Sequence, residues 1–139
     1  MIRQRIYIED YDIVVHAYYA VSCYYAEEIL DKLYSLGCRG SKYRKAENSL
    51  YAGKLDTGLT YYSNRQREAV MVIALTSSAA EFYNSLMHEL SHLTAYIAKG
   101  ELLSFTGEEI AYLEGDLARN MFPKVQPLLC DCCRNKVRL

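Results

Sequence analysis

The stretch Ser85-Leu86-Met87-His88-Glu89-Leu90-Ser91-His92 decides how the rest of the sequence is interpreted. It contains the pattern H-E-x-x-H inside a run with helical periodicity. Residues four apart lie on one face of a helix, so His88 and His92 can direct two imidazoles at one metal ion. Glu89 can reach a water bound to that metal without ligating it. We therefore predict two zinc ligands and a general base, with histidines that merely cover a helix face as the alternative.

The residues around this stretch predict a long helix from about residue 79 to 99. Ser77 or Ser78 can cap its start, and Glu81 completes a capping box with Ser78. Gly100 is expected just beyond its end, in the C′ position. A core stripe is predicted at Phe82, Leu86, Leu90, Leu93 and Ile97, and a cleft-lining face at His88, Glu89, His92 and Tyr96.

The remaining elements predict a single α+β domain over residues 1–139. Two hairpins are expected, one from residues 3–8 and 13–19 and the other from residues 58–62 and 69–75. The near-continuous apolar character of residues 69–75 indicates a strand covered on both faces. The sheet should therefore be small and mainly antiparallel.

Three further segments complete this prediction. A helix capped by Ser22 should end at Gly37, and a helix capped by Thr106 should end near Pro123. Residues 42–51 fit either a short helix or a loop. His16 most simply lies in a strand without a metal role. We expect residues 124–139 to form a flexible tail.

The composition excludes several classes of partner. The 139 residues carry a net charge of −1, which gives no electrostatic basis for binding nucleic acid or an anionic membrane. The five cysteines are odd in number and follow no export signal, so we expect reduced thiols and a cytoplasmic location. Cys130, Cys132 and Cys133 could hold a second zinc or sense redox state, but they are one ligand short, and a functionally neutral tail is the preferred interpretation.

A catalytic zinc takes three protein ligands and leaves one position for water. The residues after His92 lack the glycine and third histidine of the H-E-x-x-H-x-x-G-x-x-H class, so a carboxylate from the following helix is expected. Glu108 shares a helix face with Ala111 and Gly115, whose small size would let two helices approach closely. We predict Glu108 as the third ligand, with Glu109 as the alternative. The other acids available are Glu101, Glu114 and Asp116.

The segments His88–His92 and Glu108-x-x-Ala111-Tyr112-Leu113-x-Gly115 together resemble the gluzincin arrangement. They and the stretch Gly53–Tyr61 are also similar to a group of small H-E-x-x-H proteins of phages and gut bacteria. This resemblance covers about residues 47–120. It implies a minimal zincin fold, one catalytic Zn²⁺, metallopeptidase activity and a protein of a bacterial host or phage. It again points to Glu108, because the gluzincin ligand commonly precedes an alanine by three positions.

One position departs from the thermolysin-like pattern, which has an aspartate where this chain has Tyr112. The residue that orients a ligand histidine is therefore not evident, and Asp116 or a backbone carbonyl could substitute. Tyr96 and Tyr112 are candidates for the donor that stabilises the oxyanion.

We expect Glu89 to take a proton from the zinc-bound water during attack on a peptide carbonyl and to pass it to the leaving amine. The expected partner is thus a peptide or protein substrate. Two other hypotheses remain open. One is a catalytically inactive interaction module with the same fold, and the other is a partner-dependent protease similar to the repressor-cleaving zincins of mobile elements. The same ligand set also suits iron or manganese.

Overall fold

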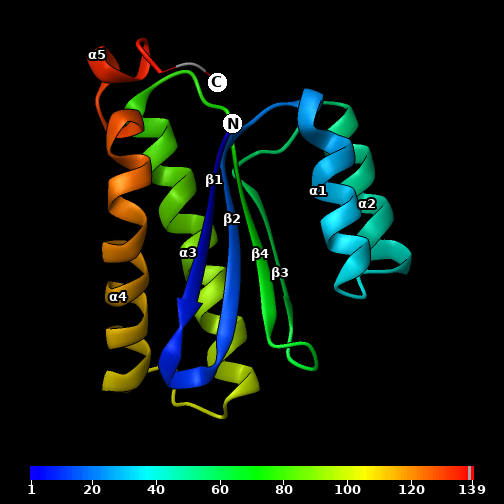
Figure 1. Ribbon diagram of the computed structural model, residues 1–139, viewed down its shortest axis with the longest axis vertical. Helices are drawn as coiled ribbons and strands as arrows, with labels where there is room; N and C mark the ends of the chain where they lie inside the picture. The colour runs from blue at the N-terminus through cyan, green and yellow to red at the C-terminus, as the bar shows by residue number, and fades with distance from the viewer. Residues whose placement is uncertain (138) are drawn as a thin grey trace.

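Four strands form one sheet in the order β1-β2-β4-β3 (Figure 1). The computed structural model describes residues 1–137 and Leu139. The strands are β1 (Ile2–Ile8), β2 (Ile13–Val21), β3 (Gly58–Ser63) and β4 (Glu68–Ala74). Two antiparallel hairpins, β1–β2 and β3–β4, meet through the parallel pair β2–β4. This confirms the α+β class and both predicted hairpins.

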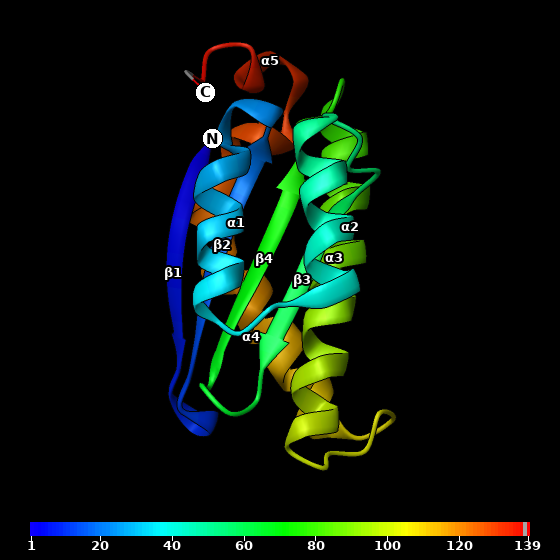
Figure 2. The same cartoon turned by 90° about the vertical axis from the view of Figure 1, so that its right-hand side faces the viewer.

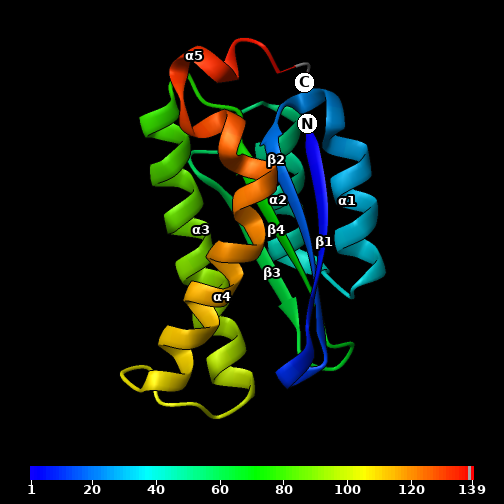
Figure 3. The same cartoon turned by 60° about the vertical axis from the view of Figure 1, so that its left-hand side comes forward.

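Helices cover both faces of the sheet (Figures 1 and 3). Helices α3 (Ala79–Gly100) and α4 (Glu108–Val125) lie on one face, and α1 (Ala26–Ser35) and α2 (Gly40–Tyr51) lie on the other. Every residue of β4 from Ala69 to Ala74 is buried. The prediction of a strand covered on both faces is therefore confirmed.

The crossover between β2 and the second hairpin differs in detail from the prediction. A short 3₁₀ helix, η2 (Cys23–Tyr25), precedes α1, so Ser22 does not cap α1. Gly37 adopts φ +89 just beyond that helix, as a helix stop requires. Residues 40–51 form α2, which decides between the helix and loop alternatives in favour of the helix.

Helix α3 begins where the capping pattern placed it. The Ser78 Oγ accepts a hydrogen bond from the Glu81 backbone N–H at 3.2 Å. The end of the helix corrects the prediction, because Gly100 is the last helical residue and the left-handed conformation belongs to Leu102, with φ 57. A Cβ at Gly100 would come within 2.9 Å of the Asn64 Oδ1, so this glycine permits close contact with the β3–β4 turn. The predicted core stripe Phe82, Leu86, Leu90, Leu93 and Ile97 is buried throughout.

The C-terminal segment packs against the start of α3. Helix α4 begins after Gly107 without a side-chain cap, so the prediction of Thr106 as its cap is wrong. The helix continues through Pro123 and is followed by η3 (Gln126–Leu129) and α5 (Asp131–Arg134). The Asp131 carboxylate accepts a hydrogen bond from the Ala79 backbone N–H at 2.8 Å, at the first turn of α3. The residues predicted to be a flexible tail thus have defined contacts in the part of the chain described.

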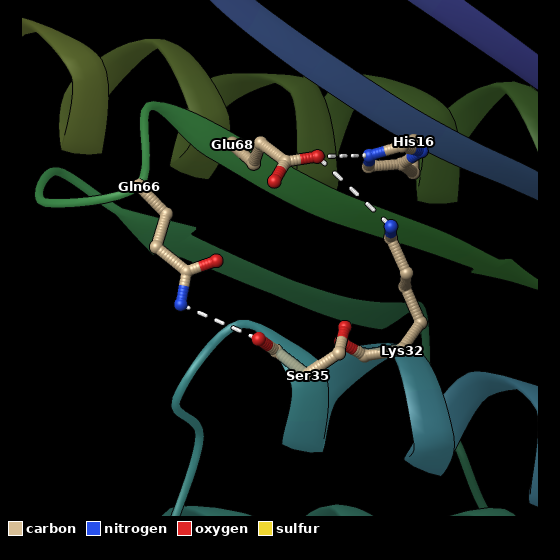
Figure 4. A network of polar contacts seen from close by, with 5 residues as sticks. All are labelled: His16, Lys32, Ser35, Gln66 and Glu68. Carbon is tan, nitrogen blue, oxygen red and sulfur yellow. Dashed lines mark hydrogen bonds and ion pairs between the residues drawn. The ribbon is translucent and has the colours of Figure 1, made fainter.

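A polar network joins α1 to the sheet (Figure 4). The His16 Nε2 of β2 lies 2.7 Å from the Glu68 Oε1 of β4, and the Lys32 Nζ of α1 lies 3.9 Å from the same oxygen. Gln66 adds a hydrogen bond of 3.3 Å to the Ser35 carbonyl. His16 therefore lies in a strand, as predicted, with its ring held by a carboxylate.

Within the described residues, no helix combines the length and apolar character needed to cross a bilayer.

Candidate active site

A cavity of about 460 Å³ opens at the edge of the sheet formed by β3. Helix α3 lies on one side of this edge and α2 on the other (Figures 1 and 2). The predicted cleft-lining residues of α3 all contribute to this cavity, namely His88, Glu89, His92 and Tyr96. One face of α3 therefore packs into the core while the adjacent face lines the cavity.

The two histidines are held one helical turn apart. Their Nε2 atoms are 3.2 Å from each other, and both side chains are exposed. Two imidazole nitrogens bound to one tetrahedral zinc at 2.0–2.1 Å would lie about 3.3 Å apart. The same spacing also suits an N–H···N hydrogen bond between neutral rings. The pair therefore fits two ligands of one metal ion without needing to move.

Tyr96 fixes one of these rings. Its ring stacks on His92 with the centroids 5.8 Å apart and the planes 20° from parallel. Tyr96 lies one turn further along α3, so helical spacing alone brings the two rings together. This stacking restricts the orientation of the imidazole.

Glu89 lies between the histidines in sequence but is buried, with 3% of its surface exposed. Its Oε2 accepts a hydrogen bond from the Thr57 hydroxyl at 2.8 Å, and its Oε1 accepts one from the Thr60 hydroxyl at 3.0 Å. The Oε2 also lies 3.9 Å from the His88 Nε2. Among the described residues, no lysine or arginine pairs with this carboxylate. The carboxylate is therefore held by two neutral hydroxyls and, among the described residues, has no lysine or arginine beside it, which is a costly arrangement for a buried charge.

Gly58 brings β3 close enough for these hydrogen bonds. Its φ is +155, and an added Cβ would lie 1.8 Å from the Val72 carbonyl oxygen and 3.1 Å from the Glu89 Cγ. No other residue fits between β4 and α3 at this position. The glycine thus lets Thr57, directly before it, and Thr60, two residues after it, reach the carboxylate.

Glu108 does not join this site. It is exposed at the first turn of α4 and lines a separate cavity with Leu102, Leu103, Ser104, Gly107 and Glu109. Ala111 is exposed and Gly115 has open space where a Cβ would stand, so the predicted close approach of two helices along this face is wrong. In the part of the chain described, no three or more His, Cys, Asp or Glu residues are grouped to hold a metal.

The position of α4 explains why Glu108 lies outside the site that the sequence predicted for it. Helix α4 packs on β1 and against α3 through Leu113, Leu117 and Met121. The histidines of α3 instead face β3, at the opposite edge of the sheet. A carboxylate on α4 therefore approaches α3 from the side away from His88 and His92.

The predicted supporting residues on α4 are displaced in the same way. Asp116 pairs with Arg119 at 2.7 Å, and it lines a cavity beside β1 together with Tyr112 and Glu109. The suggestions that Asp116 orients a histidine and that Tyr112 stabilises an oxyanion are therefore wrong. Tyr96 is the tyrosine of that pair that lies in the candidate site.

Two threonines and one wall of the cavity were not predicted from the sequence. Both threonines belong to the stretch Gly53–Tyr61, and alternation along β3 places Gly58, Thr60 and Tyr62 on one face. The sequence of residues 42–51 fits either a helix or a loop, so it does not by itself predict the wall formed by α2. A helix there places Lys42, Lys45 and Ser49 on one face.

The cysteines take no part in this site apart from Cys38, which is buried in the cavity lining. Burial raises the pKa of its thiol, against the opposing effect of the Lys42 and Arg39 charges. Cys130, Cys132 and Cys133 are exposed near α5. Hydrogen bonds from Cys133 and from the Cys132 backbone lower the pKa of the Cys130 thiol, while that of Cys133 is raised by the same pairing.

Comparison of the chain with protein-family models, with curated proteins and with solved structures found no match.

Proposed function

We propose that the protein is a zinc-dependent hydrolase of peptide bonds, with Glu89 as the acid/base residue. The observation that carries this proposal is the position of Glu89. Its carboxylate is buried, is held by two threonine hydroxyls, lies 3.9 Å from the His88 Nε2, and pairs with no lysine or arginine of the described residues. Burying a charged carboxylate beside a pair of imidazoles is costly unless a cation is added at the imidazoles.

His88 and His92 would hold the metal through their Nε2 atoms. When bound, zinc would polarise a carbonyl and lower the pKa of a coordinated water. Glu108 lies outside the site, so the two histidines are the protein ligands of this proposal and the other positions are open to water and substrate. Affinity for zinc should therefore be lower than in a site with three protein ligands.

A peptide substrate is supported by the strand that borders the cavity. β3 is the terminal strand of the sheet, and its residues 58–61 line the cavity. A terminal strand presents unpaired backbone N–H and C=O groups, which can pair with an extended peptide. A peptide bound in this way would run between α3 and α2, with its backbone beside the histidines.

The chemistry of the chain's own residues follows from this arrangement. Water adds to the carbonyl carbon of the peptide bond, and Glu89 accepts the proton that the water loses. Glu89 then donates this proton to the amide nitrogen as the C–N bond breaks, giving a carboxylate and an amine. Thr57 and Thr60 keep both carboxylate oxygens in place throughout, and each oxygen retains a lone pair for the transferred proton.

A second candidate function is an interaction module that binds metal without turnover, or that needs a partner protein to become active. The specific observation in its favour is the position of Glu108 on the far side of α3 from the histidines. A partner or the substrate would then supply the third ligand. The fold would be the same in both candidates.

Two measurements on the purified chain test the proposal. Zinc content per chain should approach one in the wild type and in Glu89→Gln, because Glu89 is not a ligand. Cleavage of a denatured proteome, followed by mass spectrometry of new termini, should fall by about 10²–10⁴-fold in Glu89→Gln. Glu81→Gln is the matched control, since it removes an exposed carboxylate from the same helix. Equal cleavage by Glu89→Gln and the wild type would exclude the hydrolase and leave the interaction module.

A further inference from the structure

Three lysines stand on the wall of the cavity opposite α3. Lys42 and Lys45 lie on one face of α2, and Lys54 follows this helix. All three side chains are exposed, and none forms an ion pair with another described residue. Unpaired cations facing a cavity create a positive potential within it.

The chain turns at the end of α2 in a way that places Lys54 in the cavity lining. Gly53 adopts φ +63, and the backbone N–H of Lys54 donates to the Ser49 carbonyl at 2.9 Å. This is the usual way in which a glycine closes a helix and redirects the chain. Ser49, Lys45 and Lys42 share the face of α2 that lines the cavity.

The carboxylates of the cavity do not balance this wall. Glu89 is buried beneath the histidines and engaged by its two threonines. Asp56 is the other acidic residue of the lining, and it is exposed. A divalent cation at the histidines would add further positive charge.

We infer that the cavity selects peptides with acidic side chains at the positions that face α2. This inference rests on the proposed function, because it describes the substrate of the same site. Leu59 and Tyr61 of β3 point to the face covered by α1 and α2, whereas Tyr62 points to the face of α3. An extended peptide paired with β3 alternates in the same way, so every second side chain meets the lysines.

Two sets of labelled peptides with the same uncharged residues test this inference. One set carries Asp or Glu at alternate positions, and the other carries Lys at those positions. Binding is measured by fluorescence anisotropy with zinc-loaded Glu89→Gln, and turnover with the wild type. We expect the acidic set to bind at least about tenfold more tightly at low ionic strength. The difference should shrink as added salt screens the lysines.

Charge reversal identifies the residues responsible. Lys42→Glu with Lys45→Glu should abolish or invert the preference. Arg44→Glu should preserve it, because Arg44 is exposed on the same helix and does not line the cavity. Circular dichroism establishes that each variant is folded, and the salt titration of the wild type tests the inference even where the double variant fails to fold.

The outcomes separate this inference from the proposed function. Acid-selective binding without cleavage of any peptide would support the inference and exclude the hydrolase. Cleavage without a preference for acidic peptides would support the hydrolase and overturn the inference. Equal competition by an oligonucleotide at the same ionic strength would also overturn it, since the cavity would then bind anions without regard to a peptide backbone.

Discussion

Glu68 and Glu89 each lie beside a histidine, but they differ in what balances the carboxylate. Glu68 has His16 at 2.7 Å and Lys32 at 3.9 Å, so the chain supplies a cation (Figure 4). Glu89 is far more buried, with 4% of its side chain exposed against 30%, and its partners are two neutral hydroxyls. The first cluster contains a lysine, whereas the second contains no lysine or arginine among the described residues. A histidine close to a glutamate is therefore not enough to identify a candidate active site.

The largest expected effect that separates the two clusters is on metal binding. His88→Ala should lower the affinity for zinc by more than about 100-fold, since removing a ligand costs more than removing its supporting partners. His16→Ala should leave that affinity unchanged. Competition with a chromophoric chelator measures both. Weak zinc binding that is equal in His88→Ala and the wild type would contradict the role of the histidine pair.

Stability should show the opposite order. His16→Ala removes a partly buried hydrogen bond to a carboxylate and should cost about 1.5–3 kcal/mol. His88→Ala changes an exposed side chain and should change the metal-free stability by less than about 0.5 kcal/mol. Urea unfolding of the metal-free proteins gives both values. A larger loss for His88→Ala would show that the exposed histidine is part of the structural framework.

A smaller effect is expected from the hydroxyls around Glu89. Thr60→Val removes one donor while keeping the shape of the side chain, and should lower kcat/KM by about tenfold through loss of one hydrogen bond to the charged group. Thr60→Ser keeps the donor and should restore most of the rate. Glu68→Gln alters the other cluster, and should leave kcat/KM unchanged while lowering stability by about 1 kcal/mol. Equal rates in Thr60→Val and Thr60→Ser would mean that the hydroxyl does not position the carboxylate.

The smallest effect belongs to a third glutamate, Glu28, which is paired with Arg3 on the surface. Hydrogen bonds of 2.6 Å from the Arg3 guanidinium lower the pKa of the Glu28 carboxyl. A lowered pKa in the folded state stabilises the protein above the unfolded pKa of about 4.3, and this stabilisation is lost as the pH falls through the folded value. Both side chains are exposed, so the contribution should be below about 1 kcal/mol.

A pH series of urea unfolding measures that contribution. The stability difference between the wild type and Arg3→Gln should be constant at neutral pH and vanish in acid. A difference that grew as the pH fell would contradict the pairing. The contribution of this exposed pair to the free energy of unfolding is thus the reference value for the more buried Glu68 and Glu89.

The elements of the fold followed from local patterns in the sequence. Ser78 and Glu81 gave the start of α3, and the apolar residues at helical spacing gave its buried face. The continuous apolar run of β4 indicated a strand between two layers of helices. Helix ends were less predictable, because the left-handed residue beyond α3 is Leu102 and Gly100 is needed for contact with a distant turn.

The site was predictable only within α3. Positions 88, 89 and 92 are related by helical geometry alone, so their common face could be predicted. Glu108 could not be assigned correctly in the same way. Helical spacing shows which residues share a face, but not which edge of the sheet the helix covers. Thr57 and Thr60 meet Glu89 through the packing of β3 on α3, which depends on contacts across about 30 residues of sequence.

Gly58 carries a consequence for attempts to stabilise this protein. Replacing glycine by alanine is a common means of raising stability, because it restricts the unfolded chain. At position 58 the new methyl group would overlap the Val72 carbonyl oxygen and press on Glu89. A thermostability screen should therefore reject substitutions here even when activity is not selected. Selection for folding would thus retain the close contact of β3 with β4 beside Glu89, even in variants that have lost activity.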